Sequence, residues 1–311
     1  MKKILITGGL GFIGSKIINK LDRSKYSITI VDNKSTNITD NFKDFKFLNL
    51  DLSDKNILNK KFNESYDIVL HLAGQSSGPA SIEDPIKDVQ LNILMTVNTI
   101  LLSRKLNIKK FIFASTFAVY GDSSKEVLSE NDYCFPKSIY AISKKSSEEY
   151  IKVLCHEYNI NYIILRMFNV YGEGQDLNRD NQGIVKIFLK QVKENNLINV
   201  KGSVKRFRDM VHVDDVVNAW IISIVNDNIE NKTFNVGTGK KTTIQELIQS
   251  LGKIYNKDKD LVIKEIEGVK GDIMGCVANI NEISKFGYIP QINILDGIDK
   301  FKKWLDLKKD A

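Results

Sequence analysis

Short apolar runs rich in β-branched residues recur along the first half of the chain. They are "KILIT", "SITIVD", "KFLNLD", "DIVLHLA", "KFIFAS" and "NYIILR". Stretches with helical character, such as "FIGSKIINKLDRSK" and "IKDVQLNILMTVNTILLSRKLN", lie between most of them. Strands that alternate with helices are typical of βαβ units, so the pattern predicts a parallel sheet with helices on both faces.

The alternation breaks after "NVYGEGQDLNRDNQG", which indicates a second, more irregular lobe. We predict an α/β fold in which residues 1–168 form a doubly wound, Rossmann-type sheet. Residues 169–211 and 237–311 would form a smaller α/β lobe, and residues 212–236 would return to the first sheet with the late strand in "KTFNVGTG". Thr243 precedes Glu246 by three residues, which predicts a capping box and hence a helix start.

Composition excludes several classes of protein. The 311 residues are 42% hydrophobic, as in globular chains, yet no apolar run approaches the roughly 20 residues of a membrane helix. Cys134, Cys155 and Cys276 are odd in number and widely spaced, so they form neither a disulfide framework nor a zinc pattern. We therefore expect a reducing, cytoplasmic setting.

The net charge of +7 raises the question of nucleic acid. The lysines are scattered and interleaved with acids, as in "KNILNKKFNESYD", and no basic stripe with interleaved aromatic residues appears. The pattern favours a solvated, lysine-rich surface and no nucleic-acid partner. A positive cleft for an anionic substrate remains compatible with this charge.

The segment "TGGLGFIG" joins the first strand to the first helix. Gly8, Gly11 and Gly14 follow the strand directly at the spacing G-x-x-G-x-x-G. Glycine permits positive φ and leaves no Cβ in the way of a pyrophosphate. The helix that starts near Phe12 and Ile13 offers unpaired N–H groups to such an anion. Strand, glycines and helix in this order predict a dinucleotide-binding turn.

Asp32 ends the second strand, in "SITIVDN". A carboxylate there can accept hydrogen bonds from an adenosine ribose and repels a 2′-phosphate, so NAD is favoured over NADP. The basic residue Lys34 nearby argues weakly the other way.

Tyr140 and Lys144 form a Y-x-x-x-K pair in "SIYAISKKSSEEYI". On a helix these positions share a face, so the phenol and the ammonium converge. Tyrosine has a pKa of about 10, but a neighbouring lysine and the positive nicotinamide favour the phenolate and bring it within range of general-base chemistry. Thr116 lies just beyond a strand end in "FIFASTFAVYG", where open α/β sheets bind ligands, and its hydroxyl can hold a reacting sugar hydroxyl against Tyr140.

In this order the motifs resemble those of the extended short-chain dehydrogenases/reductases that act on nucleotide sugars, the group that includes UDP-glucose 4-epimerases. The resemblance runs from "TGGLGFIG" through "HLAGQ", "ASTFAVYG", "YAISK", "LRMFNVYG" and "RFRDMVHVDDVV" to "FNVGTG". It implies a seven-stranded NAD-binding sheet at the N-terminus, a smaller C-terminal substrate lobe, NAD as cofactor and a nucleotide sugar as substrate. It also implies a homodimer built on helices such as the one that carries Tyr140.

The resemblance also assigns roles to individual residues. Lys144, with Tyr140, would touch the nicotinamide ribose, and Asn169 and Arg208 would bind the diphosphate of the substrate, a task suited to the bidentate fork of arginine. Further contacts to NAD are implied at Asn33, Asp51, Leu52, Leu72, Ala73, Gly74 and Asn92.

Two departures from the family pattern bear on the reaction. Dehydratases carry Asp-Glu after the catalytic Thr, where this chain has Phe117 and Ala118, which cannot move a proton. We therefore expect neither a 4,6-dehydratase nor a UDP-glucuronate decarboxylase, which usually keeps the Glu. Many members also carry an Arg where this chain has Val269 beside Lys270, so one diphosphate contact would be lost or rerouted.

These observations predict an enzyme that oxidises the C4 hydroxyl of a nucleotide-linked sugar with NAD. A nucleotide-sugar 4-epimerase is the first choice, and a 4-dehydrogenase or 4-ketoreductase is the alternative, because all share the first step. A non-catalytic NAD sensor is disfavoured by the intact set of Thr116, Tyr140 and Lys144. The sequence names neither the sugar nor the base.

The three histidines indicate no metal site. His71, His156 and His212 lack carboxylates or cysteines clustered at ligand spacing, so we expect structural or surface roles for them.

Overall fold

The computed structural model describes residues 1–36, 42–54, 56–60, 62, 64–176, 183–268 and 274–307. Val269 and Lys270 therefore lie outside the described residues. The chain divides into two compact units. Unit 1 comprises Met1–Gly121, Tyr133–Arg166 and Val217–Phe234, and unit 2 comprises Asp122–Asp132, Met167–Val216 and Asn235–Ala311. The segment Asp122–Asp132 thus groups with the second unit, although the sequence analysis placed it in the first.

Unit 1 is built on a seven-stranded sheet, so the predicted Rossmann-type fold class is confirmed. The strand order is β12-β7-β5-β4-β1-β2-β3, and the pairs from β5 through β3 are parallel. The order reverses beside β1, which creates the crevice where doubly wound sheets bind ligands. The strands are β1 Lys2–Thr7, β2 Tyr26–Asp32, β3 Lys46–Asn49, β4 Ile68–His71, β5 Lys110–Thr116, β7 Asn161–Met167 and β12 Lys232–Val236.

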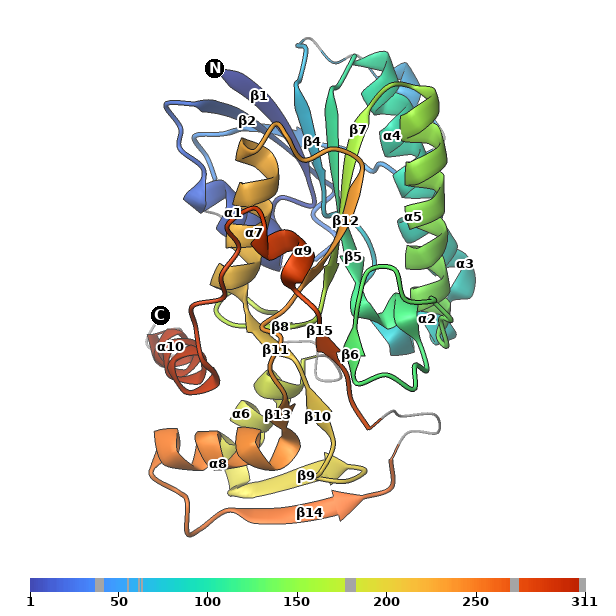
Figure 1. The fold of residues 1–311 in the computed structure, drawn as a ribbon. Coiled ribbons are helices and arrows are strands. Elements are labelled where there is room, and N and C mark those ends of the chain that lie inside the picture. Colours follow the sequence, from blue (N-terminus) through green and yellow to red (C-terminus); the bar gives the residue numbers. More distant parts are fainter. Residues whose placement is uncertain are drawn as a thin grey trace. The chain divides into compact units, whose positions relative to one another are not determined.

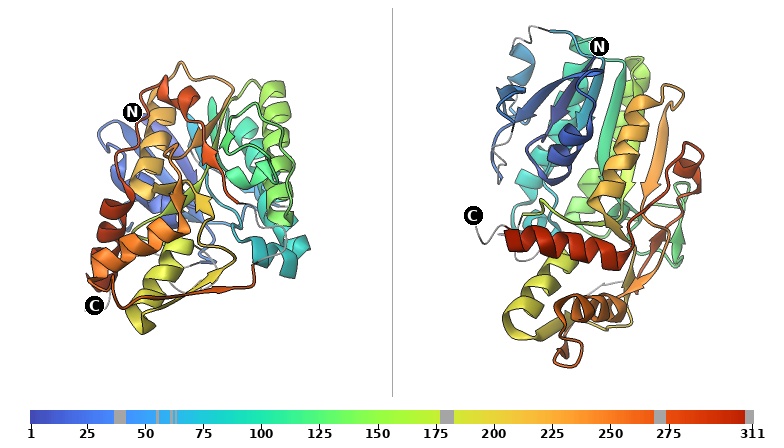
Figure 2. Two further views of the ribbon diagram at one scale, coloured as in Figure 1. Left: turned by 60° about the horizontal axis from the view of Figure 1, so that its bottom comes forward. Right: turned by 90° about the vertical axis from the view of Figure 1, so that its left-hand side faces the viewer.

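Helices cover both faces of this sheet (Figures 1 and 2). α4 (Met95–Lys105) and α5 (Ile139–Glu157) lie on one face, and α1 (Phe12–Lys20) and α7 (Val213–Val225) lie on the other. α7 crosses the boundary between the two units. The remaining elements are the short helices α2 Gly78–Glu83 and α3 Pro85–Val89, the π-helical turn η2 Gln90–Leu94, and the 3-10 turns η1 Ile57–Asn59 and η3 Phe117–Tyr120.

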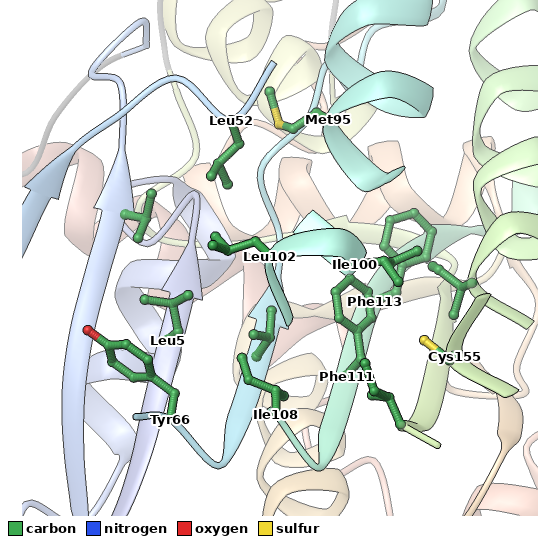
Figure 3. Close-up of a cluster of buried hydrophobic side chains, with 14 of the residues drawn as sticks. Leu5, Leu52, Tyr66, Met95, Ile100, Leu102, Ile108, Phe111, Phe113 and Cys155 are labelled. Atoms are coloured by element: carbon green, nitrogen blue, oxygen red, sulfur yellow. The ribbon is translucent and has the colours of Figure 1, made fainter. Parts of the chain in front are cut away.

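The apolar core between the sheet and α4 and α5 fixes the position of these helices (Figure 3). Leu5, Phe111 and Phe113 project from the strands and are fully buried, and they meet Ile100 of α4 and Cys155 of α5. Burying a side chain of this size stabilises the fold by roughly 1.5–3 kcal/mol. Helix α5 is therefore held against the sheet, and its first turns lie beside the carboxyl end of β5.

Unit 2 consists of short strand pairs and three longer helices. The pairs are β8 with β11, β9 with β14, β10 with β13, and β6 with β15. An apolar cluster that includes Phe188, Leu247 and Phe301 joins the three helices. The strands are β6 Val127–Leu128, β8 Asn169–Tyr171, β9 Leu197–Lys201, β10 Phe207–Arg208, β11 Met210–His212, β13 Thr242–Thr243, β14 Val262–Ile266 and β15 Val277–Ala278. The helices are α6 Ile184–Asn195, α8 Ile244–Tyr255, α9 Asn281–Ser284 and α10 Ile294–Leu307.

The start of α8 has the local structure that its sequence predicts. The Thr243 side chain accepts the backbone N–H of Glu246, and the Glu246 carboxylate accepts the backbone N–H of Thr243 at 2.7 Å. The predicted capping box is therefore confirmed.

Candidate active site

The glycine-rich turn after β1 is packed too closely for any larger residue. Gly8 has a φ of +67°, and a Cβ added to it would lie 2.6 Å from the backbone nitrogen of Ala73. A Cβ on Gly14 would lie 2.5 Å from the carbonyl oxygen of Gly8. Gly11 is the N-cap of α1 and supplies no side-chain cap, so the first N–H groups of the helix, at Phe12 and beyond, have no side-chain acceptor from the cap residue. Such a turn fits a pyrophosphate.

Polar side chains gather at the carboxyl ends of β2 and β3. Asp32 accepts the backbone N–H of Leu10 at 3.1 Å and that of Lys34 at 2.8 Å, which ties β2 to the glycine-rich turn. The Asn33 amide donates to Asp51 at 3.2 Å. Burial raises the pKa of Asp51, but hydrogen bonds from Ser53 and Asn33 outweigh it and leave that pKa below its usual value. Each Asp32 oxygen keeps a lone pair for a ribose hydroxyl.

The segment after β4 lies against the same turn. Leu72 donates its N–H to the carbonyl of Thr7 at 3.1 Å, and Ala73 donates to the Thr7 hydroxyl at 3.3 Å. A Cβ on Gly74 would lie 2.9 Å from Asn92 Oδ1 and 3.4 Å from Lys144 Nζ. Asn92 Oδ1 is buried and has no hydrogen-bond partner, so it can accept a hydrogen bond from a ligand hydroxyl.

A buried polar chain joins these parts through His71. The His71 ring lies 2.8 Å from the Thr7 hydroxyl through Nδ1 and 3.2 Å from the Thr96 hydroxyl through Nε2. Thr96 donates in turn to the Asn92 carbonyl at 2.6 Å, which assigns the ring proton to Nε2. Ser147 of α5 donates to the same carbonyl at 3.2 Å. Burial, together with the charge of Lys144, lowers the pKa of His71 to about 3, so the ring is neutral and structural.

The structure brings Thr116, Tyr140 and Lys144 together. Thr116 ends β5, and its hydroxyl hydrogen-bonds with that of Tyr140. Lys144 lies one turn further along α5, is buried, and donates to the Ala114 carbonyl at 3.0 Å. Ser81 accepts the backbone N–H of Tyr140 at 3.1 Å, which fixes the first turn of α5.

Burial shifts the two titrating groups of this set in opposite directions. It raises the pKa of Tyr140 to about 12, although the hydrogen bond from Thr116 lowers it. It lowers the pKa of Lys144 to about 8, although the carboxylates of Asp88 and Glu148 raise it. With a pKa of about 12, the phenol of Tyr140 is neutral at physiological pH, and a positive charge beside it is needed to favour the phenolate.

A buried ion pair that was not predicted from the sequence supports this set. Arg166 Nη2 lies 2.7 Å from Glu148 Oε2, and Arg166 Nε donates to Oε1 at 3.0 Å. Ser115, next to Thr116, donates to Glu148 at 2.5 Å. The pair therefore links β7, α5 and the end of β5. Glu148 follows Lys144 by four residues, which places it on the same helix face and was the available signal.

Asn169 and Arg208 belong to unit 2. Asn169 donates its backbone N–H to the Asp209 carbonyl at 3.1 Å, and its Oδ1 is buried without a hydrogen-bond partner. Arg208 donates to the Phe207 carbonyl at 2.7 Å, and burial lowers its pKa. Asp209 is fully buried and accepts hydrogen bonds from Thr238, Gly239 and Ala278, so it anchors the neighbourhood of Arg208.

His212 pairs with acids in unit 2. The backbone N–H of Asp214 donates to His212 Nδ1 at 3.2 Å, which puts the ring proton on Nε2, and Nε2 lies 3.1 Å from Glu173 Oε2. These three residues are close enough to hold an ion. Nδ1 already accepts a backbone hydrogen bond, and Nε2 faces the Glu173 carboxylate, so the arrangement also suits a structural link between β11 and Glu173.

The chain belongs to the NAD-dependent epimerase/dehydratase family, whose profile matches residues 4–237. The family resemblance, the assignment to an enzyme class and NAD as the cofactor are thereby confirmed. The glycine-rich turn and the unpartnered Asn92 Oδ1 fit that cofactor. Within the ranges that the structure describes, no helix combines the length and apolar character needed to cross a membrane.

Individual relatives are similar along nearly their full length. The chain is 34% identical to a putative UDP-glucose 4-epimerase of Methanocaldococcus jannaschii, over 97% of this chain and 98% of that protein. The UDP-glucose 4-epimerase of Thermotoga maritima, solved with UDP-glucose, superposes with a TM-score of 0.91 at 32% identity, covering 99% of both chains. The UDP-glucose 4-epimerase of Thermus thermophilus, solved with NAD, gives 0.88 at 30% identity, covering 98% of this chain and 99% of its own.

The first prediction concerns Asp32 and the choice of cofactor. Because its carboxylate repels a 2′-phosphate, titration of the NAD-free protein should show at least about tenfold tighter binding of NAD than of NADP, or about 1.4 kcal/mol. Asp32→Ala should reduce the difference between the affinities for NAD and NADP. Asp44→Ala, a matched change at an exposed acid outside the site, should leave that difference unchanged. Equal affinities in the unaltered protein would contradict the role given to Asp32.

The second prediction concerns the ion pair under the site. Arg166→Met leaves the buried Glu148 charge without its main partner, so it should lower the free energy of unfolding by about 3–5 kcal/mol. Adding Glu148→Leu should recover part of that loss, because no unpaired charge remains. Urea denaturation measures both changes. A double variant less stable than Arg166→Met alone would show that the charges are not coupled as described.

Proposed function

We propose that this protein is an NAD-dependent nucleotide-sugar 4-epimerase acting on a UDP-linked hexose. The observation that carries the proposal is the convergence of Thr116, Tyr140 and Lys144 at the carboxyl end of β5, in the unit that carries the glycine-rich turn. The similarity to UDP-glucose 4-epimerases over nearly the whole chain supports the same reaction.

The proposed chemistry assigns one task to each residue. Tyr140, as phenolate, takes the proton of the C4 hydroxyl, and Thr116 holds that oxygen in place. Bound NAD would supply the redox chemistry, accepting the hydride from C4 and returning it to the opposite face of the sugar. Tyr140 returns its proton to the C4 oxygen, so the proton count of enzyme and sugar is unchanged. The Lys144 ammonium stabilises the phenolate and binds the nicotinamide ribose.

The cofactor-binding roles fall on residues of unit 1. Gly8, Gly11, Phe12, Ile13 and Gly14 would cradle the pyrophosphate, supported by the close packing of the turn and the uncapped N–H groups at the start of α1. Contacts to the rest of the dinucleotide would come from Asp32, Asn33, Asp51, Leu52, Leu72, Ala73, Gly74 and Asn92.

Unit 2 would bind the substrate. Asn169 and Arg208 are proposed to hold its diphosphate, since the buried, unpartnered Oδ1 of Asn169 and the half-buried cation of Arg208 are both suited to a polar ligand. Residues 1–168 with 212–236, and 169–211 with 237–311, remain our proposed cofactor and substrate domains.

The residues after Thr116 argue against elimination of water. Phe117 and Ala118 occupy η3, and neither can donate or accept a proton. The reaction should therefore stop at a change of configuration at C4.

We also propose a homodimer in a reducing, cytoplasmic setting. Helix α5 exposes Ile142, Tyr150 and Val153. Tyr150 follows Ile142 by eight residues and Val153 follows Tyr150 by three, so the three side chains share one face of the helix. Leu94 of the neighbouring η2 is exposed as well. A second copy would cover this apolar face. The three cysteines are free thiols, which fits a reducing compartment.

The third prediction tests the chemistry. Incubation with a panel of UDP-, GDP-, CDP- and dTDP-sugars should give a C4 epimer of unchanged mass from a UDP-hexose, measured by mass spectrometry and NMR. Tyr140→Phe should lose about a hundredfold or more in rate while still binding NAD. A product lighter by one water would overturn the proposal. Release of a keto sugar with stoichiometric NADH would instead identify a 4-dehydrogenase.

The fourth prediction tests the dimer. Val153→Glu places a charge in the proposed interface, so the protein should dissociate to monomers at micromolar concentration in sedimentation velocity. Val225→Glu is the matched control, since Val225 is also exposed but lies on α7, on the opposite face of the sheet. An unaltered protein that sediments as a monomer would exclude the dimer.

A further inference from the structure

Asp88 is a buried carboxylate beside the active site. It lies on α3 and is 1% exposed. Its Oδ1 accepts from the Gln75 amide at 2.9 Å and from the Asn92 amide at 3.0 Å, while its Oδ2 is buried without a hydrogen-bond partner. Both hydrogen-bond partners are neutral, so these contacts orient the carboxylate without cancelling its charge.

The other carboxylate near Lys144 differs in this respect. Glu148 is engaged by Arg166 at 2.7 Å and by Ser115, so most of its charge is balanced locally. Among the described residues, Asp88 makes no ion pair. A buried charge is costly unless it is compensated, so the position of Asp88 calls for a nearby cation that benefits from it.

Lys144 is that cation. The Asn92 amide donates to Asp88, which fixes the Asn92 side chain. A Cβ added to Gly74 would lie 2.9 Å from Asn92 Oδ1 and 3.4 Å from Lys144 Nζ, so both atoms border the same small space. The Asp88 carboxylate, the Asn92 side chain and the Lys144 ammonium therefore form one buried group next to Tyr140.

We propose that Asp88 is a positioning residue that orients Asn92 and sets the protonation state of the Tyr140–Lys144 pair through its negative charge. The inference deepens the proposed function, on which its catalytic meaning rests.

The electrostatics of the site agree with this geometry. Asp88 raises the pKa of Lys144 against the effect of burial, and it raises the pKa of Tyr140 as well. The other groups that face the pair are Glu148, which also raises the pKa of Lys144; the neutral ring of His71; the Thr116 hydroxyl; and the Ala114 carbonyl. Without Asp88, burial would discharge Lys144 at a lower pH.

The sign of the effect does not depend on which member of the pair loses its proton first. Loss of one proton changes the net charge of the pair from +1 to 0, whether it leaves the phenol of Tyr140 or the ammonium of Lys144. A nearby negative charge opposes that step in both cases. Removing the charge of Asp88 must therefore lower the pH at which the pair releases its first proton.

Asp88→Asn isolates the charge from the geometry. An asparagine Oδ1 can still accept from Gln75 and Asn92, and its amide occupies the place of Oδ2, which has no hydrogen-bond partner. Asp84→Asn is the matched control: Asp84 lies on the same segment, is exposed, and caps α3, a role that asparagine also fills. Asp88→Ser removes the same charge and serves if the Asn variant does not fold.

The primary measurement is a ¹³C NMR titration of lysine-labelled protein, with the Lys144 signal assigned by its loss in Lys144→Arg. The unaltered protein should titrate near pH 8. Asp88→Asn should lower that midpoint by about one pH unit, and Asp84→Asn should leave it in place. An unchanged or raised midpoint in Asp88→Asn would overturn the proposal. This measurement needs no substrate, so it stands even if the proposed reaction is wrong.

The pH profile of epimerase activity is the second measurement. The acid limb of kcat should move to lower pH in Asp88→Asn by a similar amount, because the pair releases its proton earlier. A merely structural role would reduce kcat at all pH values and leave the limb in place, which would also overturn the proposal.

Discussion

A lysine ammonium buried in a protein must be kept charged, and much of this active site follows from that constraint. Burial disfavours the charged form of Lys144. Three groups stabilise that charge: the carbonyl of Ala114 and the carboxylates of Asp88 and Glu148. Each reaches Lys144 only because β5, α3 and α5 are packed as they are. The charge in turn favours the phenolate of Tyr140, so the chemistry proposed for this protein rests on how the core holds α5.

The cofactor turn depends on the same packing. Gly8 and Gly14 allow backbone segments to meet at distances that no Cβ would tolerate, and Thr7 fastens the segment after β4 to them. His71 continues that contact across the sheet to Thr96 and so to α5. Because the ring is neutral, this link is insensitive to pH across the physiological range. The residues proposed to hold NAD and those proposed to move a proton are thus linked by one chain of hydrogen bonds.

The sequence predicted features that are local and missed those that are tertiary. The strands, the glycine-rich turn and the Tyr140–Lys144 spacing are patterns of period two, three or four, and such patterns are readable in one dimension. Nothing local shows that Arg166 on β7 meets Glu148 on α5, or that Asp88 faces Lys144. The grouping of Asp122–Asp132 with the second unit is not readable in the sequence for the same reason, since the pairing of β6 with β15 joins residues far apart in sequence.

The π-helical turn η2 restricts where residues can be inserted into or deleted from this chain. It widens the helical path between α3 and α4 so that Asp88 and Asn92 reach the site while the Asn92 carbonyl receives Thr96 and Ser147. Each helical residue advances the path by about 100°, so a deletion within Gln90–Leu94 would turn one of these groups away from the others. Relatives that keep this constellation must therefore conserve the spacing of this segment as strictly as the identity of its residues, and insertions should be confined to loops elsewhere.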